Sequence, residues 1–251
     1  MLPYIILFGL ALPVPAITML IGIWTGITLA ERNARNHRLN PADLYNLFIY
    51  ALIGGIIGGR LAYVLQFPSA FLENPISLIS PNPGLFDLVG GILTGLISAE
   101  FYRQRKKMPF WITLDALTPA LAVVQMALPI AHLASGDAYG APTSLPWGIN
   151  LWGETRHPTQ IYEALAAGVI LWQMWPGRGK GQSKPGVVFL QFISYSAMAR
   201  LFLEAFRGDS LVTVFNLRVV QLIALSILAL SMWGLYFLNK DKSAPSKNPV
   251  Q

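Results

Sequence analysis

The sequence predicts an all-α integral membrane protein with seven transmembrane helices, its N-terminus outside and its C-terminus in the cytoplasm. The chain is 54% hydrophobic and only 12% charged, whereas a soluble domain carries about 25% charged residues. Crossing a bilayer takes about 20 apolar residues, and such runs lie at 4–29, 44–66, 85–102, 111–133, 158–175, 186–206 and 217–238. These runs are continuously apolar, which disfavours a β-barrel of alternating strands.

Local signals refine the ends of several runs. Pro13 and Pro15 interrupt the first run and predict a short outer segment followed by a helix over about 16–30. At the fifth run, His157 fits the N-cap position and Pro158 fits the first helical position. We expect one seven-span domain over 1–240 and a short polar cytoplasmic tail over 241–251, with no cleavable signal peptide.

The basic residues alternate from loop to loop. They follow the first, third, fifth and seventh runs as Arg32, Arg35 and Arg38; Arg103, Arg105, Lys106 and Lys107; Arg178, Lys180 and Lys184; and Lys240, Lys242 and Lys247. The other loops hold only Arg156, Arg207 and Arg218. Because cytoplasmic loops carry the excess of Lys and Arg, the N-terminus is predicted outside. Orientation and attraction to anionic lipids account for this charge, so no nucleic-acid partner is expected.

Acidic residues divide between the two sides. Glu100 and Asp115 lie near inner ends and are predicted to be structural partners of the basic 103–107 loop. The outer side is predicted to hold Asp137, Glu154, Arg156, His157 and Arg207, so we expect the chemistry to face the outer leaflet.

The chain has no cysteine, which excludes disulfides, a thiol nucleophile and cysteine-based metal sites.

Arg200, Glu204 and Arg207 are spaced to share one helix face. One interpretation is a self-neutralising ladder in which Glu204 pairs with both arginines. The other is a phosphate clamp, because arginine binds phosphate oxygens bidentately. The two are compatible, since Glu204 could orient an arginine that holds phosphate.

Arg60 ends a run of glycines in the second span. The pairs Gly54-Gly55 and Gly58-Gly59 make two overlapping GxxxG motifs that predict close helix packing. Arg60 lies deep in the span and must find an acid, a carbonyl or a ligand phosphate. Gly90-Gly91 in the third span predicts tight packing or room for a lipid.

The segment Arg156-His157-Pro158-Thr159-Gln160-Ile161-Tyr162-Glu163 gathers polar groups at the mouth of an apolar span. The plain interpretation is helix capping and anchoring at the interface, together with Trp147 and Trp152. Polar groups at a membrane boundary are costly, however, and a helix N-terminus attracts anions. The number of polar groups exceeds what a cap needs, which favours a functional site.

Taken together, these motifs resemble the prolipoprotein diacylglyceryl transferase family from about residue 16 to residue 238. The resemblance rests on Gly58-Gly59-Arg60, Gly90-Gly91, the Gly-acid-x-aromatic-Gly loop at 136–140, Leu-Pro-Trp-Gly at 145–148, the 156–163 segment and Arg-x-x-x-Glu-x-x-Arg at 200–207. It implies a seven-span bundle of the bacterial inner membrane whose active site opens to the outer leaflet. The implied reaction transfers diacylglyceryl from phosphatidylglycerol to the lipobox cysteine of a preprolipoprotein.

Some family positions differ in this chain. Val89 stands where the family has a histidine, Pro129 where it has an arginine, His132 where it has an asparagine and Asp137 where it has a glutamate, and the tyrosine expected near the first full span aligns near Pro15. Three interpretations remain open: a divergent transferase, a relative that binds phospholipid or lipoprotein signal segments without catalysis, and another lipid-modifying enzyme on the same scaffold.

The candidate site follows from the outer-side residues and the resemblance. The predicted catalytic residues are His132 as base with Asp137 as its partner, His157 as the alternative base, and Glu204, which orients an arginine. The predicted substrate-binding residues are Arg60, Arg156, Tyr162, Glu163, Arg200, Arg207 and Gly140. The expected partners are phosphatidylglycerol, the preprolipoprotein signal segment and membrane lipids, with no cofactor and no metal.

Overall fold

The computed structural model describes residues 3–7, 10–80, 82–176, 184–213 and 217–240. The chain forms two compact units, one of residues 1–37 and 114–251 and the other of residues 38–113, and each is considered by itself. The single domain expected over 1–240 stays a prediction, and the tail at 241–251 lies outside the described residues, as do Arg178 and Lys180.

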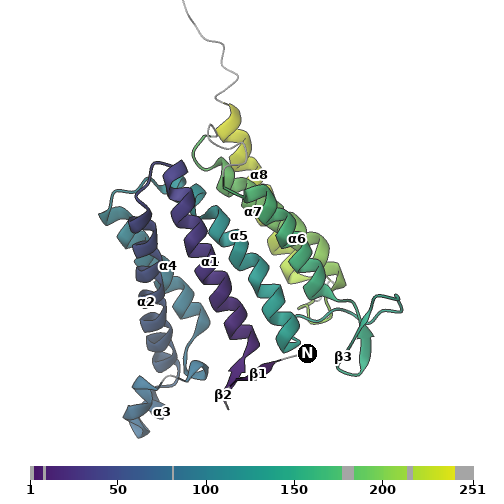
Figure 1. Ribbon diagram of the computed structural model, residues 1–251. Coiled ribbons are helices and arrows are strands. Elements are labelled where there is room, and N and C mark those ends of the chain that lie inside the picture. Colours follow the sequence, from purple (N-terminus) through teal and green to yellow (C-terminus); the bar gives the residue numbers. More distant parts are fainter. Residues whose placement is uncertain (1–2, 8–9, 81, 177–183, 214–216, 241–251) are drawn as a thin grey trace, which may run out of the picture. The chain divides into compact units, whose positions relative to one another are not determined.

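The larger unit consists of long helices with two small hairpins (Figure 1). Its elements are β1 (Tyr4–Leu7), β2 (Leu10–Pro13), α1 (Val14–Asn36), α5 (Phe110–Ser135, from residue 114 onward), β3 (Ile149–Leu151), β4 (Glu154–Arg156), α6 (Thr159–Met174), α7 (Val187–Leu203), η3 (Glu204–Phe206) and α8 (Val219–Lys240).

The first apolar run divides at its prolines, as predicted, but the outer segment is a β-hairpin. β1 and β2 pair antiparallel with Tyr4 opposite Pro13, and Pro15 lies in the first turn of α1. Proline suits this position because the first helical residues have no intrahelical partner for their N–H. α1 therefore starts at Val14 and extends to Asn36, beyond the predicted 16–30.

Small residues and one apolar cluster hold the larger unit together. A Cβ on Gly22 of α1 would overlap the Cβ of Ala127 in α5, so glycine allows the close approach of these two helices. α5, α6 and α7 meet in a buried cluster of Ala122, Ile170, Met174, Val188 and Phe192. The hydroxyls of Ser194 and Ser231, 2.8 Å apart, join α7 to α8.

Asp115 corrects one sequence-based prediction, because it does not pair with the basic 103–107 loop. Its carboxylate accepts hydrogen bonds from the backbone N–H groups of Gly186, at 2.6 Å, and Phe189, at 2.8 Å. The first N–H groups of a helix have no intrahelical partner, so Asp115 satisfies the start of α7. The prediction for Glu100 is confirmed, since its carboxylate lies 2.6 Å from the guanidinium of Arg103.

The smaller unit is built on a glycine-lined pair of helices. Its elements are α2 (Pro41–Gln66), α3 (Pro68–Glu73), η1 (Pro75–Ile79), η2 (Pro83–Leu85) and α4 (Leu88–Arg105). A Cβ on Gly59 would lie 2.9 Å from the carbonyl oxygen of Asp87, and one on Gly95 would lie 2.9 Å from that of Ala51. The close packing predicted from the two GxxxG motifs is confirmed.

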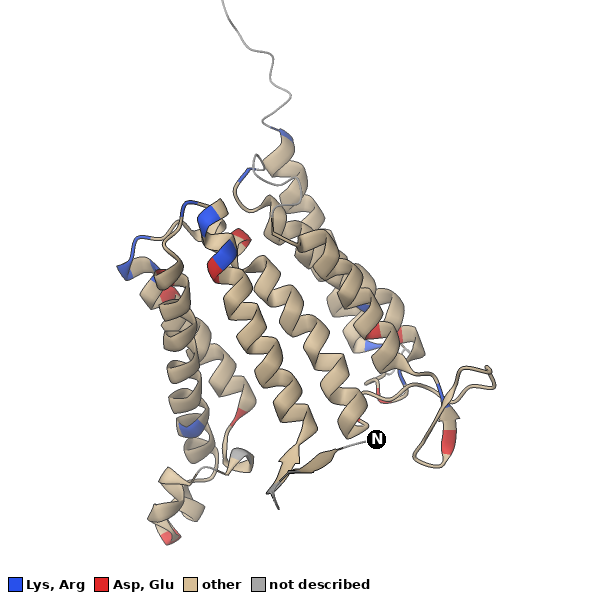
Figure 2. Ribbon diagram, in the orientation of Figure 1, with Lys and Arg blue, Asp and Glu red and all other residues tan. Residues whose placement is uncertain are grey.

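Helix lengths identify a multi-pass membrane protein. Among the described residues, five helices are long and apolar enough to cross a bilayer, namely α1, α2, α5, α7 with η3, and α8. α4 has 18 residues and α6 has 16, and each of the seven predicted apolar runs contains a helix. Basic residues occupy the last turns of α1, α4 and α8, as Arg35, Arg103, Arg105 and Lys240 (Figure 2).

Candidate functional site

The end of α7 separates the two arginines that the sequence places on one helix face. α7 ends at Leu203, a single 3-10 turn covers Glu204–Phe206, and Arg207 follows in an extended conformation with φ −76° and ψ 142°. Arg200 therefore projects from the helix and Arg207 from the chain beyond it. The ladder in which Glu204 pairs with both arginines does not form, because the helix stops before Arg207.

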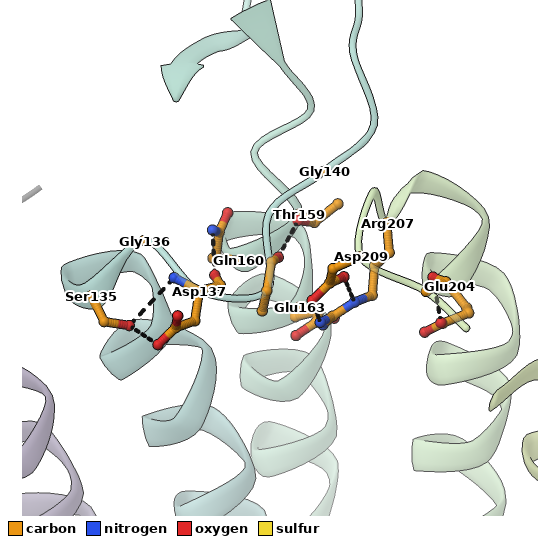
Figure 3. Close-up of polar contacts among 12 residues, drawn as sticks. Ser135, Gly136, Asp137, Gly140, Thr159, Gln160, Glu163, Glu204, Arg207 and Asp209 are labelled. Atoms are coloured by element: carbon orange, nitrogen blue, oxygen red, sulfur yellow. Dashed lines mark hydrogen bonds and ion pairs between the residues drawn. The ribbon is translucent and has the colours of Figure 1, made fainter. Parts of the chain in front are cut away.

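Glu163 of α6 connects the two arginines instead. Its Oε1 lies 2.8 Å from Nη1 of Arg200 and 2.9 Å from Nη1 of Arg207. Asp209 holds the other side of Arg207 through two bonds, 2.9 Å from Nε and 2.7 Å from Nη2 (Figure 3). The two guanidinium groups thus converge on one carboxylate oxygen.

Glu204 lies beneath this pair and is 1% exposed. Its Oε2 forms an ion pair at 3.0 Å with Nη2 of Arg200, without hydrogen-bond alignment. Its Oε1 accepts a hydrogen bond of 2.7 Å from the hydroxyl of Ser210. Glu204 therefore pairs with Arg200, and the orienting role that one of the sequence-based interpretations gives it stays a prediction.

Arg218 supports the chain that carries this cluster. Its Nη1 lies 2.5 Å from the carbonyl oxygen of Glu204, 2.8 Å from that of Arg207 and 2.8 Å from Oγ of Ser210. The sequence-based site did not include Asp209, Ser210 or Arg218. The position of Asp209 two residues after an arginine on the outer side was the available signal for the first of these.

The surroundings of Arg207 favour its charged form. Burial lowers the pKa of this guanidinium, but the hydrogen bonds and charges of Asp209 and Glu163 outweigh burial and raise the pKa above its ordinary value. Arg207 therefore remains a cation throughout the physiological pH range.

A cavity of about 170 Å³ opens beside Glu163 and Arg200, between α5, α6 and α7. Its other lining residues are Gln125, Leu128, Pro129, Ala166, Ala167, Ser196, Ala199 and Leu203. The hydroxyl of Ser196 donates a hydrogen bond of 2.8 Å to Oε1 of Gln125 at its wall. The cavity thus combines charged groups with a mostly apolar lining.

A larger apolar groove of about 630 Å³ continues from this cavity between α6 and α7. Ala166 and Ala199 line both spaces. The groove is further lined by Val169, Ile170, Gln173, Tyr195, Met198 and Phe202.

The loop after α5 is bonded to the chain that carries Arg207. The backbone N–H of Ala141 donates to the carbonyl of Phe206 at 2.8 Å, and that of Gly208 donates to the carbonyl of Tyr139 at 2.9 Å. A Cβ on Gly208 would lie 2.6 Å from the carbonyl oxygen of Gly140. A Cβ on Gly140 would overlap the carbonyl of His157, so both glycines are required for this contact.

The start of α6 differs by one residue from the sequence-based assignment. Pro158 is the N-cap, Thr159 begins the helix, and His157 precedes the cap. Nδ1 of His157 lies 3.5 Å from the hydroxyl of Tyr162, which accepts a hydrogen bond of 2.8 Å from Nε1 of Trp147. The ring of His157 also packs edge-on against Phe206, with centroids 5.2 Å apart.

Arg156 holds the same loop from the other side. Its Nη1 donates to the carbonyl of Gly140 at 3.2 Å, Nη2 lies 2.5 Å from Glu154, and its guanidinium stacks 4.9 Å from the centre of the Tyr139 ring. Gln160 of α6 donates to the carbonyl of Asp137 at 2.8 Å (Figure 3).

His132 and Asp137 lie at the end of α5 without a bond between them. The carboxylate of Asp137 accepts a hydrogen bond of 2.7 Å from the hydroxyl of Ser135 (Figure 3). Within the described part of the chain, Nδ1 of His132 is buried and has no hydrogen-bond partner. The structure thus gives Asp137 a different partner from the one expected, and the role of His132 as base stays a prediction.

Arg60 belongs to the smaller unit and is 7% exposed. Its guanidinium donates to the carbonyls of Leu78 at 2.9 Å, Leu85 at 2.8 Å and Ser80 at 3.1 Å, and also to that of Ser77. The rings of Phe86 and Phe71 lie 4.9 and 5.7 Å from its central carbon. Of the three partners expected for it, Arg60 finds carbonyls, and its contact with substrate stays a prediction.

Among the predicted residues of the larger unit, the structure therefore joins Glu163, Arg200, Glu204 and Arg207 into one cluster. Gly140, Arg156, His157 and Tyr162 form the loop and helix start bonded to it.

This chain is similar to known proteins along nearly its whole length. The sequence pattern of the family described as prolipoprotein diacylglyceryl transferase matches residues 3–237. A phosphatidylglycerol–prolipoprotein diacylglyceryl transferase of Nostoc is 30% identical, over 85% of this chain and 80% of its own. Proteins of the same name from Thermosynechococcus vestitus and Clostridium tetani are each 29% identical, over 89% and 94% of this chain and 85% and 96% of their own.

Proposed function

This chain belongs to the prolipoprotein diacylglyceryl transferase family, and we propose that it transfers diacylglyceryl from phosphatidylglycerol to a cysteine of a prolipoprotein. In this reaction the cysteine thiol loses its proton and its sulfur attacks the terminal carbon of the diacylglyceryl group. The bond from that carbon to the phosphate oxygen breaks, a thioether forms, and glycerol phosphate leaves.

The reaction takes place at the outer leaflet of the bacterial cytoplasmic membrane, with seven spans, the N-terminus outside and the C-terminus inside. Basic residues in the last turns of α1, α4 and α8 support this orientation, because Lys and Arg are retained on the cytoplasmic side. The acid–arginine cluster lies at the opposite end of α7 from Lys184, which supports an outer-side position for it.

Arg200 and Arg207 bind the phosphate of phosphatidylglycerol. The observation that carries this assignment is the convergence of both Nη1 groups on one carboxylate oxygen, at 2.8 and 2.9 Å. An anionic phosphate oxygen, like a carboxylate oxygen, accepts charge-assisted hydrogen bonds from guanidinium groups. In the transition state these cations stabilise the charge that develops on the leaving phosphate.

The acyl chains of the lipid extend from this cluster into apolar space. Ten helical residues separate Glu163 at the cavity from Gln173 at the end of the groove, which corresponds to about 15 Å along the axis at about 1.5 Å per residue. This equals half of a hydrocarbon core of about 30 Å. A groove of this depth suits an acyl chain that spans one leaflet.

The thiol requires a proton acceptor, since the thiolate is the nucleophile. His157 is close to the cluster through Tyr162 and Phe206, and His132 carries a buried, unbonded Nδ1. We assign the base to one of these two histidines. Tyr162 orients His157, and Arg156 and Gly140 hold the loop against it.

A second candidate function is binding of phospholipid or lipoprotein signal segments without catalysis. Val89 favours it, because this residue stands where the family pattern has a histidine and is 65% exposed at the start of α4. An aliphatic side chain can neither accept nor donate the proton of a thiol.

Complementation of a bacterium depleted of its own transferase tests the proposal. Mass spectrometry of a reporter lipoprotein would detect the thioether-linked diacylglyceryl group if the chain is a transferase. Absence of this adduct, with the protein present in the membrane, would contradict transfer. Retained binding of phosphatidylglycerol in that case would support the second function.

A further inference from the structure

The arginine pair at the end of α7 carries no excess of positive charge. Arg200 and Arg207 are in contact with three carboxylates, those of Glu163, Glu204 and Asp209. Arg218, which bonds to backbone carbonyls and Ser210, brings the local sum only to zero. A phosphodiester anion is not attracted to such a site unless one carboxylate gives way, because like charges repel at short range.

The three carboxylates differ in how firmly they are held. Glu204 is 1% exposed and is also bonded to Ser210. Asp209 makes two parallel bonds to Arg207, the strong bidentate arrangement. Glu163 contacts both arginines through the single atom Oε1, so it is the least constrained of the three.

Glu163 is also the carboxylate that lines the proposed lipid cavity. It lines the cavity together with Arg200, whereas Glu204, Arg207 and Asp209 do not. An anion that enters the cavity therefore meets Glu163 together with Arg200. The groups that would bind the anion are the two Nη1 groups that Oε1 of Glu163 contacts.

We infer that Glu163 is an exchangeable counter-ion that occupies the position of the substrate phosphate and is displaced by it. In the absence of lipid, its carboxylate prevents repulsion between Arg200 and Arg207 and keeps both donors aligned. On binding, a phosphate oxygen replaces Oε1 between the two guanidinium groups. This inference rests on the proposed function. It adds a positioning role for Glu163, whose carboxylate competes with the substrate phosphate for the two arginines.

The inference predicts an unusual effect of substitution. Removing a residue that binds substrate weakens binding, but removing a competing counter-ion strengthens it. Glu163→Gln keeps the size of the side chain and removes its charge. Glu163→Asp keeps the charge but shortens the reach, so the carboxylate cannot hold both arginines equally well.

The test measures binding of short-chain phosphatidylglycerol to the full chain in detergent by isothermal titration calorimetry. We expect Glu163→Gln to bind about fivefold more tightly than the wild type, which corresponds to the upper end of the range for one partly exposed ion pair. Glu163→Asp should fall between the two and serves if the glutamine variant does not fold. Glu154→Gln is the matched control, since Glu154 is an outer-side carboxylate paired with Arg156 alone, and should leave binding unchanged.

A kinetic measurement separates this role from a purely structural one. With a lipobox peptide as acceptor, the KM for phosphatidylglycerol should fall in Glu163→Gln by the same factor as the dissociation constant. Equal or weaker lipid binding by both Glu163 variants would overturn the exchange. If the wild type binds no phosphatidylglycerol, or Arg200→Gln binds it equally well, the proposed function itself fails.

Discussion

Two arginine sites in this protein hold their positive charge with different partners. Arg60 of the smaller unit is surrounded by backbone carbonyls and two phenyl rings. Arg200 and Arg207 of the larger unit are paired with carboxylates beside a cavity. A carbonyl belongs to the main chain and cannot leave without unfolding its segment, whereas a carboxylate on a side chain can rotate away.

This difference assigns distinct tasks to the two sites. The guanidinium of Arg60 gathers carbonyls of the 77–85 segment, so we expect its main contribution to be to structure. The pair of Arg200 and Arg207 presents donors that an incoming anion can take over. Four predictions follow from this contrast, from the largest expected effect to the smallest.

Loss of an arginine from the cluster should abolish most of the activity. Arg200→Gln and Arg207→Gln each remove a cation that we propose stabilises the leaving phosphate, and loss of one such donor typically costs about 100-fold in rate. Thioether formation on a lipobox peptide measures the effect. Unchanged rates in both variants would show that the cluster is structural, like the site of Arg60.

Replacement of Arg60 should reduce stability rather than act on phosphate. Arg60→Met fills similar space but leaves four carbonyls without a donor. An unsatisfied buried group costs about 1–3 kcal/mol, but the residues that carry these carbonyls are half-buried or exposed and water can replace part of the lost bonding, so we expect a total loss of about 3 kcal/mol. Thermal unfolding in detergent measures it.

Arg105→Ala is the matched control, since Arg105 is an exposed residue of the same unit, and it should leave the free energy of unfolding within about 0.5 kcal/mol of the wild type. If Arg60→Met unfolds normally but loses phosphatidylglycerol binding, Arg60 is a headgroup ligand and the contrast between the two sites is wrong.

A bulky side chain between the cavity and the groove should interfere with the lipid chain. Ala199→Phe inserts a ring where the two spaces meet, and we expect about a tenfold lower rate, equivalent to about 1.4 kcal/mol in the barrier. Ala229→Phe places the same ring on the exposed surface of α8 and should have little effect. Equal rates for the two variants would show that the acyl chain does not occupy this groove.

Acid should weaken the smaller unit through Asp87, with the smallest effect of the four. The N–H of Gly90 and the side chain of Gln66 lower the pKa of this carboxyl below its ordinary value of 3.8. The stabilisation is therefore fully present above the pKa of this carboxyl in the unfolded chain, and it is lost as the pH falls through the lower pKa of the folded state. Asp87→Asn should flatten the pH dependence of unfolding below about pH 4, and an unchanged profile would exclude this contribution.

The helical part of the fold follows closely from the sequence. All seven predicted apolar runs contain helices, since a continuous apolar run of this length buries its backbone polar groups only as a helix. Periodicity does not distinguish a short apolar strand from a helix, so the hairpin of β1 and β2 was not predicted. The start of α6 differed by one residue because both His157 and Pro158 suit a helix boundary.

Contacts between distant residues were less predictable. The nearness of the basic 103–107 loop in the sequence suggested an ion pair with Asp115. The carboxylate of Asp115 instead accepts hydrogen bonds at the start of α7, where the N–H of Gly186 is 71 residues away. Similarly, Glu204 lies four residues after Arg200 and three before Arg207, which suggested that it pairs with both. The helix ends before Arg207, and the carboxylate that contacts Arg207 is instead that of Glu163, 44 residues away.

The sequence by itself determined the membrane class, the helical runs, the close packing at Gly58-Gly59 and the residue types of the candidate site. These depend on composition and on spacing along one helix, which short-range geometry controls. Only the tertiary structure decided which acid faces which arginine, and that Arg60 is held by carbonyls while Arg200 and Arg207 share Glu163 beside a cavity. The physical reason is that a buried charge selects its partner by proximity after the helices pack, and sequence distance does not measure that proximity.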